Sequence, residues 1–353
     1  MMSAVILQIT YEDFMNKALL KNKMKPLLIA HAEDPDGIIA RALLMRQFPS
    51  FQEHIFVRYD RIAEAFEEAI GKAAGRSSVY VADINPNQRL VQAGGSDFAL
   101  LEKLAAGREV YWFDHHDATL RHKDKLAQLG IKVNHQENQC TAMIIAQHYY
   151  TSDPYARKLA KIAQAHDHKN TSSDAKNILI GNELEKVIAL ANESLDYALL
   201  LDLAEDLQYQ NCFDERYKLR SQWQYQVGKF NRREEQAYQE LDHTVEITAV
   251  GNHNLLFGYS SSLLSQKPGP FHLRQKYEKQ ADIFVCLFKQ PVRNHLVLVT
   301  KESSFPVVPF VQSLGGGGRG TGGGFTLDYD ITPENHQQVK EMLLSQIGNY
   351  SKS

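Results

Sequence analysis

Acidic residues and histidines gather directly after three short apolar runs in the first half of the sequence. In chain order they are His31, Asp34 and Asp36, then Asp83, then Asp114, His115 and His116. Short apolar runs separated by helical patterns are typical of parallel strands, and the carboxyl ends of such strands share one edge of the sheet, where ligands bind. We therefore expect these side chains to converge although they are far apart in sequence.

Carboxylates and imidazoles together are suited to divalent metal. This mixture of ligands favours Mg²⁺ or Mn²⁺, and Zn²⁺ when several histidines contribute. Concentrated carboxylates repel one another unless cations neutralise them, which indicates more than one ion. Two ions about 3.5–4 Å apart can activate a water and stabilise both the attacking and the leaving oxygen in phosphoryl transfer. A later acid, Asp167 in His-Asp-His at the end of a helical run, is a further candidate.

Each of these residues also has a simpler interpretation. Asp34 and Asp36 before Gly37 are typical of a turn or a helix cap, and Asp83 is placed to start a turn at Asn-Pro-Asn. Asp167 is placed as a solvated helix end. The triplet that begins at Asp114 is less easily explained in this way. The order of all four groups, three of them at strand ends, favours a functional site.

The first half of the chain is predicted to be an α/β domain. Its expected strands are Pro26–His31, Ile55–Tyr59, Val79–Ile84, Val110–Phe113 and Ile131–Asn134. The expected helices between them are Gly37–Gln47, Ile62–Ile70 and Phe98–Ala106. This alternation predicts βαβ units and a parallel sheet with helices on both faces.

The second half changes character twice. From Cys140 to about Arg233 the pattern is mostly helical, and strand-like runs begin near His243, at Val245–Val250, Leu255–Tyr259, Ile283–Phe288 and Leu296–Thr300, with a helix near Leu273–Lys279. We predict a catalytic domain over 1–190, a helical connector over 191–242 and a smaller α+β domain over 243–353. The amphipathic stretch from Leu195 to Asp242 is compatible with packing inside the monomer or with a homodimer interface.

Composition narrows the class of protein and of partner. The chain has 353 residues, 43% of them hydrophobic, and a formal net charge of −3, without the basic excess that long nucleic acid would require. Its three cysteines show no CxxC spacing, which predicts a reduced, cytoplasmic setting without disulfides. We expect neither a signal peptide nor a membrane span. A small anionic substrate fits this balance better than a polymer.

The four groups, in this order, resemble the motifs of the DHH phosphoesterase superfamily, named for its Asp-His-His triplet. The run Gly315–Gly324 (GGGGRGTGGG) resembles the glycine-rich motif of the substrate domain associated with that family. The resemblance implies a metal-dependent phosphoesterase that holds two divalent ions, with Mn²⁺ favoured and Mg²⁺ or another ion as the alternative.

The resemblance also implies a role for each matching residue. One ion would be held by His31, Asp34 and Asp83, and the other by Asp36, Asp83, His115 and Asp167, so that Asp83 bridges. Asp114 would orient a histidine, and His116 would face the substrate phosphate. His31 and Asp34 are three positions apart, which differs from the usual spacing and makes Glu33 an alternative ligand. Thr141 and His135 are further candidates to line the same sheet edge, although a satisfied polar cap is the favoured interpretation of both.

Glycines let a backbone approach an anion closely, so the run is expected to bind substrate rather than to serve as a linker. Arg319 stands where the family usually has histidine, and its guanidinium is suited to phosphate. The expected substrate contacts are Gly316, Gly317, Gly318, Arg319 and Gly320, with Lys301 and Arg293 as additional positive charges.

Several phosphate esters fit such a site. We expect hydrolysis of short 5′-phosphorylated oligoribonucleotides, above all linear dinucleotides such as pGpG, to nucleoside monophosphates by a water that two metal ions activate. The alternatives are a cyclic dinucleotide or 3′-phosphoadenosine 5′-phosphate as substrate, a single-strand exonuclease, and a nucleotide sensor without turnover. The sensor interpretation is disfavoured because every type of ligand is present.

Overall fold

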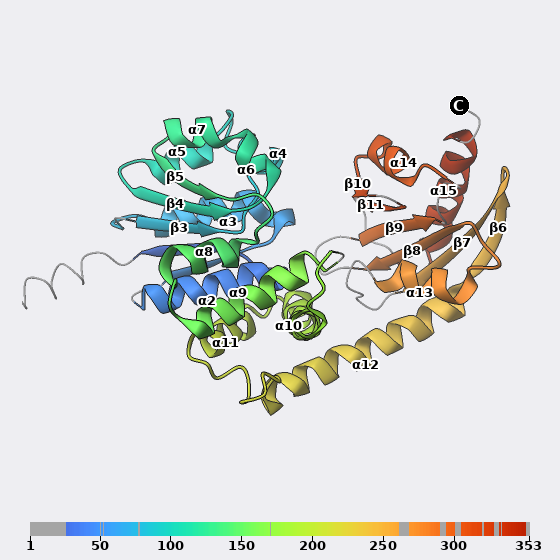
Figure 1. The fold of residues 1–353 in the computed structure, drawn as a ribbon. Coiled ribbons are helices and arrows are strands. Elements are labelled where there is room, and N and C mark those ends of the chain that lie inside the picture. Colours follow the sequence, from blue (N-terminus) through green and yellow to red (C-terminus); the bar gives the residue numbers. More distant parts are fainter. Residues whose placement is uncertain are drawn as a thin grey trace, which may run out of the picture. The chain divides into compact units, whose positions relative to one another are not determined.

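A computed structural model describes residues 26–49, 51, 53–76, 78–169, 171–260, 268–289, 294–300, 305–319, 321–327, 332 and 334–350. The described chain forms two compact units (Figure 1). The first contains the described residues up to Ile188 together with Tyr197–Trp223, and the second contains Ala189–Asp196 and the described residues from Gln224 onward. The stretch predicted as a connector is therefore divided between the units.

The first unit is built on a five-stranded parallel sheet. Its strands are β1 (Leu27–His31), β2 (Glu53–Val57), β3 (Ser78–Ala82), β4 (Glu109–Asp114) and β5 (Ile131–His135), in the spatial order β2-β1-β3-β4-β5. Every residue of β1 and β3 is buried, as expected for central strands that are covered on both faces. The register pairs His31 with Val57 and Asp114 with His135, so the carboxyl ends of these strands lie level.

Helices cover both faces of this sheet. They are α2 (Pro35–Gln47), η1 (Tyr59–Arg61), α3 (Ile62–Lys72), α4 (Gln88–Val91), α5 (Ala99–Ala105), α6 (Asp117–Arg121), α7 (Lys123–Gln128), α8 (Thr141–Tyr149), α9 (Pro154–Asp167) and α11 (Tyr197–Gln208). One face carries α3, α4, α5 and α7 over a core that includes Phe66 and Trp112. On the other face α2 packs against α8, α9 and α11 (Figure 1). The predicted α/β class is confirmed.

The second unit is an α+β assembly around a mixed sheet. Its strands are β6 (Glu246–Val250), β7 (His253–Ser260), β8 (Ile283–Lys289), β9 (Asn294–Thr300), β10 (Gly317–Arg319) and β11 (Gly322–Leu327), in the order β10-β11-β9-β8-β7-β6. Only the β7–β8 pair is parallel among these described strands. The remaining helices are α13 (Pro268–Tyr277), α14 (Val307–Ser313) and α15 (His336–Tyr350).

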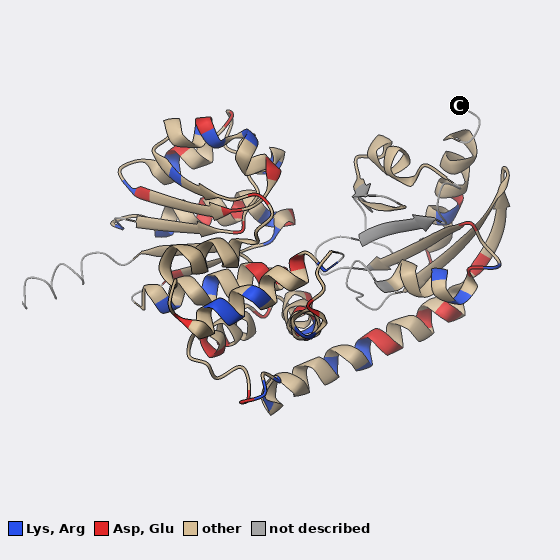
Figure 2. Cartoon of the chain, viewed as in Figure 1, with Lys and Arg blue, Asp and Glu red and all other residues tan. Residues whose placement is uncertain are grey.

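Two long helices complete the chain: α10 (Ala175–Ser194) and α12 (Ser221–Thr244). Both basic and acidic residues lie along α12, and the basic residues precede the acidic ones (Figure 2). Such mixed charge is typical of a solvated helix face. No helix among the described residues is both long enough and apolar enough to cross a membrane.

The glycine-rich run contains regular secondary structure that the sequence did not indicate. Its glycines form an antiparallel hairpin in which Gly317 pairs with Gly324 and Arg319 pairs with Gly322. Strand pairing uses only backbone groups, so glycine can take part, although its low strand propensity gives no sequence signal. The predicted helix near Leu273–Lys279 also begins earlier, at Pro268, because proline is well suited to a first helical turn.

A buried arginine fixes α2 against the edge strand β2. Arg41 is fully buried, donates hydrogen bonds to the carbonyl oxygen of Ile55 at 2.6 Å and to Nδ1 of His54 at 3.1 Å, and its guanidinium lies 3.7 Å from the centre of the Phe56 ring. No carboxylate of the described residues pairs with it. Burial lowers its pKa to about 9. Because His54 accepts this hydrogen bond, its ring must be neutral, and burial together with the Arg41 charge lowers its pKa to about 4.

This arrangement predicts a pH-dependent stability. Unfolded His54 takes up a proton near its ordinary pKa of about 6.5, whereas folded His54 resists protonation until about 4. The unfolded state therefore binds more protons between these values, and the free energy of unfolding falls as the pH falls through them. His54→Gln keeps a hydrogen-bond acceptor without a titrating ring. The free energy of unfolding, measured with urea in the presence of chelator, should fall more between pH 7 and pH 4.5 in the wild type than in His54→Gln. Equal losses in both proteins would exclude this role for His54.

Candidate metal centre

The loop between β1 and α2 brings the first three polar residues together. Asp34 is the N-cap of α2, and its Oδ1 accepts a hydrogen bond from the Gly37 amide at 3.0 Å, with Pro35 opening the helix. Its other oxygen, Oδ2, lies 3.2 Å from Nδ1 of His31. The cap and the ligand interpretations of Asp34 are therefore compatible, because each uses a different oxygen of the carboxylate.

Gly37 is required for this loop to close. A Cβ atom added at Gly37 would lie 2.4 Å from the carbonyl oxygen and 2.8 Å from Cβ of His31. Only glycine lets the first turn of α2 approach the end of β1 this closely. The glycine after the second aspartate thus has a packing reason that is independent of any ligand.

Asp83 lies at the centre of the site and is almost fully buried, at 1% exposed. Its backbone has φ of +59°, in the left-handed region, and its amide donates a hydrogen bond to the Phe113 carbonyl of the neighbouring strand at 2.9 Å. Its Oδ2 lies 3.3 Å from Nδ1 of His31, and its Oδ1 lies 3.6 Å from Nε2 of His115. The two oxygens of this one carboxylate therefore face two different groups of ligands.

Asp36 is held by the N-terminus of α8. Its two oxygens accept hydrogen bonds from the backbone amides of Thr141, at 2.7 Å, and Ala142, at 2.8 Å. The partial positive charge at a helix N-terminus stabilises such a carboxylate. Asp36 Oδ2 lies 3.9 Å from Nε2 of His115, so it borders the second group of ligands.

The three residues of the Asp-His-His triplet make different contacts. Asp114 is fully buried and accepts hydrogen bonds from Nδ1 of His116, at 2.7 Å, and from the hydroxyl of Thr119. This fixes the tautomer of His116 and leaves its Nε2 available. His115 faces Asp83 and Asp36 with Nε2 and Asp167 with Nδ1, the last at 3.8 Å.

Asp167 reaches the site from the last residue of α9. A close contact positions that end of the helix, because a Cβ atom at Gly181 of α10 would lie 2.6 Å from Cβ of His166. The His166 ring in turn lies 3.1 Å from Glu185 on the same helix α10. His168 Nε2 is buried without a hydrogen bond and lies 3.4 Å from Asp167 Oδ2.

Two groups of potential ligands result. In each group the ligand atoms lie within 4.8 Å of one another; the groups are His31, Asp34 and Asp83, and Asp83, His115 and His116. They share Asp83. His31 also has a buried Nε2 that makes no hydrogen bond. Imidazole nitrogens and carboxylate oxygens in this number fit divalent metal of the Mn²⁺ or Mg²⁺ kind. Of the other predicted ligands, Asp36 and Asp167 border the second group through His115.

The protonation of the site reflects crowded negative charge. Burial and the charge of Asp83 raise the pKa of Asp36 well above its ordinary value. Burial acts against ionisation of Asp83 too, but hydrogen bonds from His115 and His31 outweigh it and bring that pKa well below its ordinary value. Burial lowers the pKa of His115, yet Asp83, Asp36 and Asp167 outweigh burial and raise it to about 10. The carboxylates of the site therefore favour positive charge on the neighbouring imidazoles, and bound cations would supply positive charge at the same place.

Glu33, the alternative ligand, is directed elsewhere. Its Oε2 accepts a hydrogen bond from the Tyr59 amide at 3.0 Å and lies 3.5 Å from Nε2 of His31. Its other oxygen lies 4.0 Å from the guanidinium of Arg58. Glu33 therefore joins the end of β1 to the residues that follow β2, and Asp34 takes the position beside Asp83.

The expected substrate contacts of the glycine run are only partly within the described structure. Gly316, Gly317 and Gly318 are described, as is the backbone of Arg319, whereas the Arg319 side chain, Gly320, Lys301 and Arg293 lie outside the described residues. A Cβ atom at Gly316 would lie 2.3 Å from the Gly324 carbonyl oxygen, but one at Gly317 would meet nothing within 4 Å. Gly316 is thus required by packing, and Gly317 is open.

Some residues that build the site gave little sequence signal. Thr119, Thr141 and Ala142 all contact site carboxylates. The place of Thr141 at the start of a helical pattern marked a cap, but nothing in the sequence showed that the helix would cap a carboxylate from another element. Nε2 of His135 donates a hydrogen bond to the His116 carbonyl at 3.1 Å, which supports the triplet from the edge strand.

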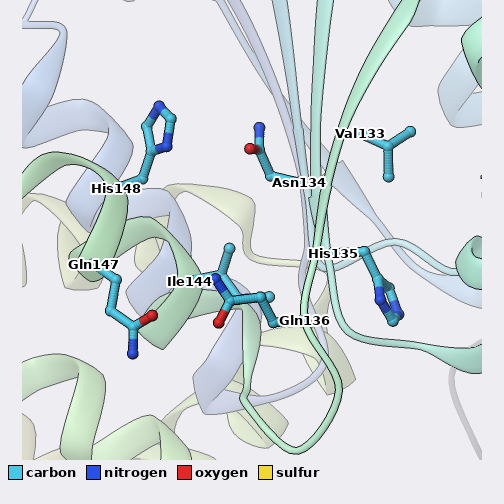
Figure 3. Close-up of a pocket in the computed structure, with 7 residues that line it drawn as sticks. All are labelled: Val133, Asn134, His135, Gln136, Ile144, Gln147 and His148. Atoms are coloured by element: carbon cyan, nitrogen blue, oxygen red, sulfur yellow. The ribbon is translucent and has the colours of Figure 1, made fainter.

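A pocket of about 400 Å³ lies between β5 and α8 (Figure 3). Its lining residues are Val133, Asn134, His135, Gln136, Ile144, Gln147 and His148. Asn134 points toward the α8 side chains, whereas Val133 and His135 point to the other side of the strand (Figure 3). His135 thus belongs both to this pocket and to the support of His116.

Comparison with solved structures identifies the fold. The pGpG-specific phosphodiesterase PggH of Vibrio cholerae aligns over 92% of this chain and 99% of its own, with a TM-score of 0.51 and 14% identity. RecJ of Thermus thermophilus, solved in complex with Mn²⁺, aligns over 99% of this chain, with a TM-score of 0.51 and 13% identity. The fold is of the DHH type. The chain spans 56% of the length of that RecJ.

At these identities the likeness is one of fold. No family model matches the sequence, and comparison with curated proteins gives no match. The DHH-type fold and the two ligand groups that share Asp83 are independent observations, since one concerns the path of the backbone and the other the side chains at the sheet edge.

The close contact at Gly37 leads to a direct test. Gly37→Ala would force a Cβ atom against the backbone of His31, and we expect a loss of about 1–3 kcal/mol in the free energy of unfolding and weaker metal binding. Gly71→Ala in α3 is the control, since a Cβ atom there meets nothing within 4 Å, and alanine in a helix should stabilise by up to about 1 kcal/mol. Chemical denaturation compares the two. A Gly37→Ala protein as stable as Gly71→Ala would refute the packing argument.

The shared carboxylate predicts how metal binding depends on Asp83. Isothermal titration of chelator-treated protein with Mn²⁺ should give two equivalents in the wild type. Asp83→Asn should lose at least one, because both groups use this residue. Glu109→Gln is the control, since Glu109 begins the strand β4 that Asp114 ends, and it is exposed. Two unchanged equivalents in Asp83→Asn would contradict the shared site.

Proposed function

We propose that this protein is a metal-dependent phosphodiesterase. Its proposed substrates are short 5′-phosphorylated oligoribonucleotides, above all linear dinucleotides such as pGpG, and its products are nucleoside monophosphates. The observation that supports this proposal most is the carboxylate of Asp83, which presents one oxygen to each of two groups of metal ligands.

A shared carboxylate between two ligand groups fits phosphate ester chemistry for a physical reason. Hydrolysis of a phosphodiester develops negative charge on both the attacking and the leaving oxygen, and a pair of divalent ions, when bound, stabilises both and activates water. His31, Asp34 and Asp83 would hold one ion. Asp83 and His115 would hold the other, with Asp36 and Asp167 beside His115.

His116 is the residue best placed to contact the substrate phosphate. Its Nδ1 donates to the buried Asp114, so Nε2 remains for the ligand. Burial lowers the pKa of His116, but Asp114 outweighs burial and raises it above the ordinary value. In its protonated form the ring can donate from Nε2 to a phosphate oxygen and stabilise the charge that develops there.

The choice of substrate rests on charge and on the fold. The net charge of −3 provides no general attraction for a long polyanion, which favours a short substrate held by local contacts. PggH, which shares the fold over nearly its whole length, is a pGpG-specific phosphodiesterase. The glycine hairpin of the second unit has an open backbone at Gly317, where an anion could be approached closely.

The test is a panel of substrates with Mn²⁺: pGpG, pApA, a five-nucleotide RNA, cyclic di-GMP, 3′-phosphoadenosine 5′-phosphate and pyrophosphate. We expect the linear dinucleotides to be converted to mononucleotides fastest, and turnover to be lost in an Asp114→Ala/His115→Ala control. His116→Ala should lower kcat by about 100- to 1,000-fold, as removal of a donor to a developing oxyanion does elsewhere.

Other outcomes would redirect the proposal. Faster turnover of the cyclic or the phosphoadenosine nucleotide would keep the metal chemistry and replace the substrate. Degradation of a long single strand as fast as of a dinucleotide would favour an exonuclease. Tight nucleotide binding without turnover of any member of the panel would make the protein a sensor and overturn the proposed activity.

A further inference from the structure

Thr141 is joined to two site carboxylates that come from two other elements. It is the first residue of α8 and fully buried. Its backbone amide donates a hydrogen bond to Asp36 Oδ2 at 2.7 Å, and its hydroxyl donates one to Asp83 Oδ1 at 3.2 Å. One residue of α8 thus connects the loop after β1 with the end of β3.

The hydroxyl of Thr141 has no role in capping its own helix. The N-cap of α8 is Cys140, and its side chain makes no capping hydrogen bond. The first amides of the helix are satisfied instead by Asp36. The Thr141 hydroxyl is directed away from these amides to Asp83, so the usual reason for a threonine at a helix start does not explain it.

Its contact with Asp83 differs from the other contacts of that carboxylate. Among the described residues, the side chains within hydrogen-bonding or ion-pairing distance of the Asp83 carboxylate are His31, His115 and Thr141. The two imidazoles belong to the two ligand groups. When metal binds, the nitrogens of these two imidazoles would face the cations rather than Asp83. Thr141 is the remaining partner, and it is not a member of either group.

The torsion that turns a carboxylate about its Cβ–Cγ bond is broad, so a free Asp83 would sample many orientations. A hydrogen bond to Oδ1 restricts that rotation. It keeps Oδ1 toward His115 and, because the carboxylate is planar, keeps Oδ2 toward His31. Restricting the orientation before metal arrives lowers the entropic cost of binding at both groups.

We propose that Thr141 is a positioning residue, whose hydroxyl orients the carboxylate of Asp83 so that each oxygen serves one ligand group. The inference rests on the proposed function, since it assigns a role within the same metal centre. It acts through Asp83 and requires no contact between Thr141 and the substrate. Partners of this kind around metal ligands typically change metal affinity by about 10- to 100-fold.

Three variants separate this role from packing. Thr141→Val keeps the shape and the backbone amide but removes the hydroxyl, and Thr141→Ser restores it. Thr244→Val is the matched control, because the Thr244 hydroxyl donates to backbone carbonyls in the second unit. Each protein is stripped with chelator, its thermal unfolding is recorded to show that it folds, and it is titrated with Mn²⁺ by calorimetry.

We expect Thr141→Val to bind Mn²⁺ about 10- to 100-fold more weakly in at least one of two equivalents, with Thr141→Ser and Thr244→Val close to the wild type. Unchanged affinity in Thr141→Val would overturn the inference. Equal weakening in the serine and valine variants would do so too, because packing would then be the cause. A loss of affinity in Thr141→Val alone supports it even if no dinucleotide is hydrolysed, in which case only the proposed function fails. A wild type that binds no Mn²⁺ would refute the metal centre itself.

Discussion

Negative charge that is held at one sheet edge and kept from water is the constraint on which this site depends. Buried carboxylates repel one another and lose their hydration, so each must find a compensating partner. The chain supplies these partners from distant elements. The N-terminus of α8 holds Asp36, and imidazoles hold Asp83. Divalent cations, when bound, would compensate the same carboxylates in place of the imidazole protons.

The constraint explains why the surrounding backbone is so closely packed. Asp83 can contact both ligand groups only if the ends of β1, β3 and β4 stay level and α2 stays close. Two contacts maintain α2. Gly37 admits its first turn against His31, and Arg41 fixes its middle to β2 by hydrogen bonds and a stacked ring. An error of an ångström at either place would separate Asp34 from Asp83, although neither Gly37 nor Arg41 is itself a ligand.

The sequence predicted those parts of the structure that local pattern encodes. Buried strands show as apolar runs, and polar residues at their ends, such as Asp83, are visible without any knowledge of contacts. It could not predict partners that are set by the packing of distant helices. The bond between Thr141 and Asp83 joins positions 58 residues apart, and no periodicity encodes it. The glycine hairpin was not predicted either. Glycine has little preference for strands, and the pairing of β10 with β11 comes from tertiary context.

The hairpin also shows how far the glycine-rich run can serve as evidence for substrate binding. Gly316 and Gly323 have neighbours at 2.3 and 2.7 Å from an added Cβ atom, and Gly315 has φ of +77°. These three glycines are therefore explained by the fold of the second unit alone. A Cβ atom at Gly317 would meet nothing within 4 Å, so packing does not require glycine at that position. The number of glycines in the run is thus weak support for substrate binding, and the functional argument depends instead on Asp83, whose buried carboxylate and left-handed backbone have no comparable structural explanation.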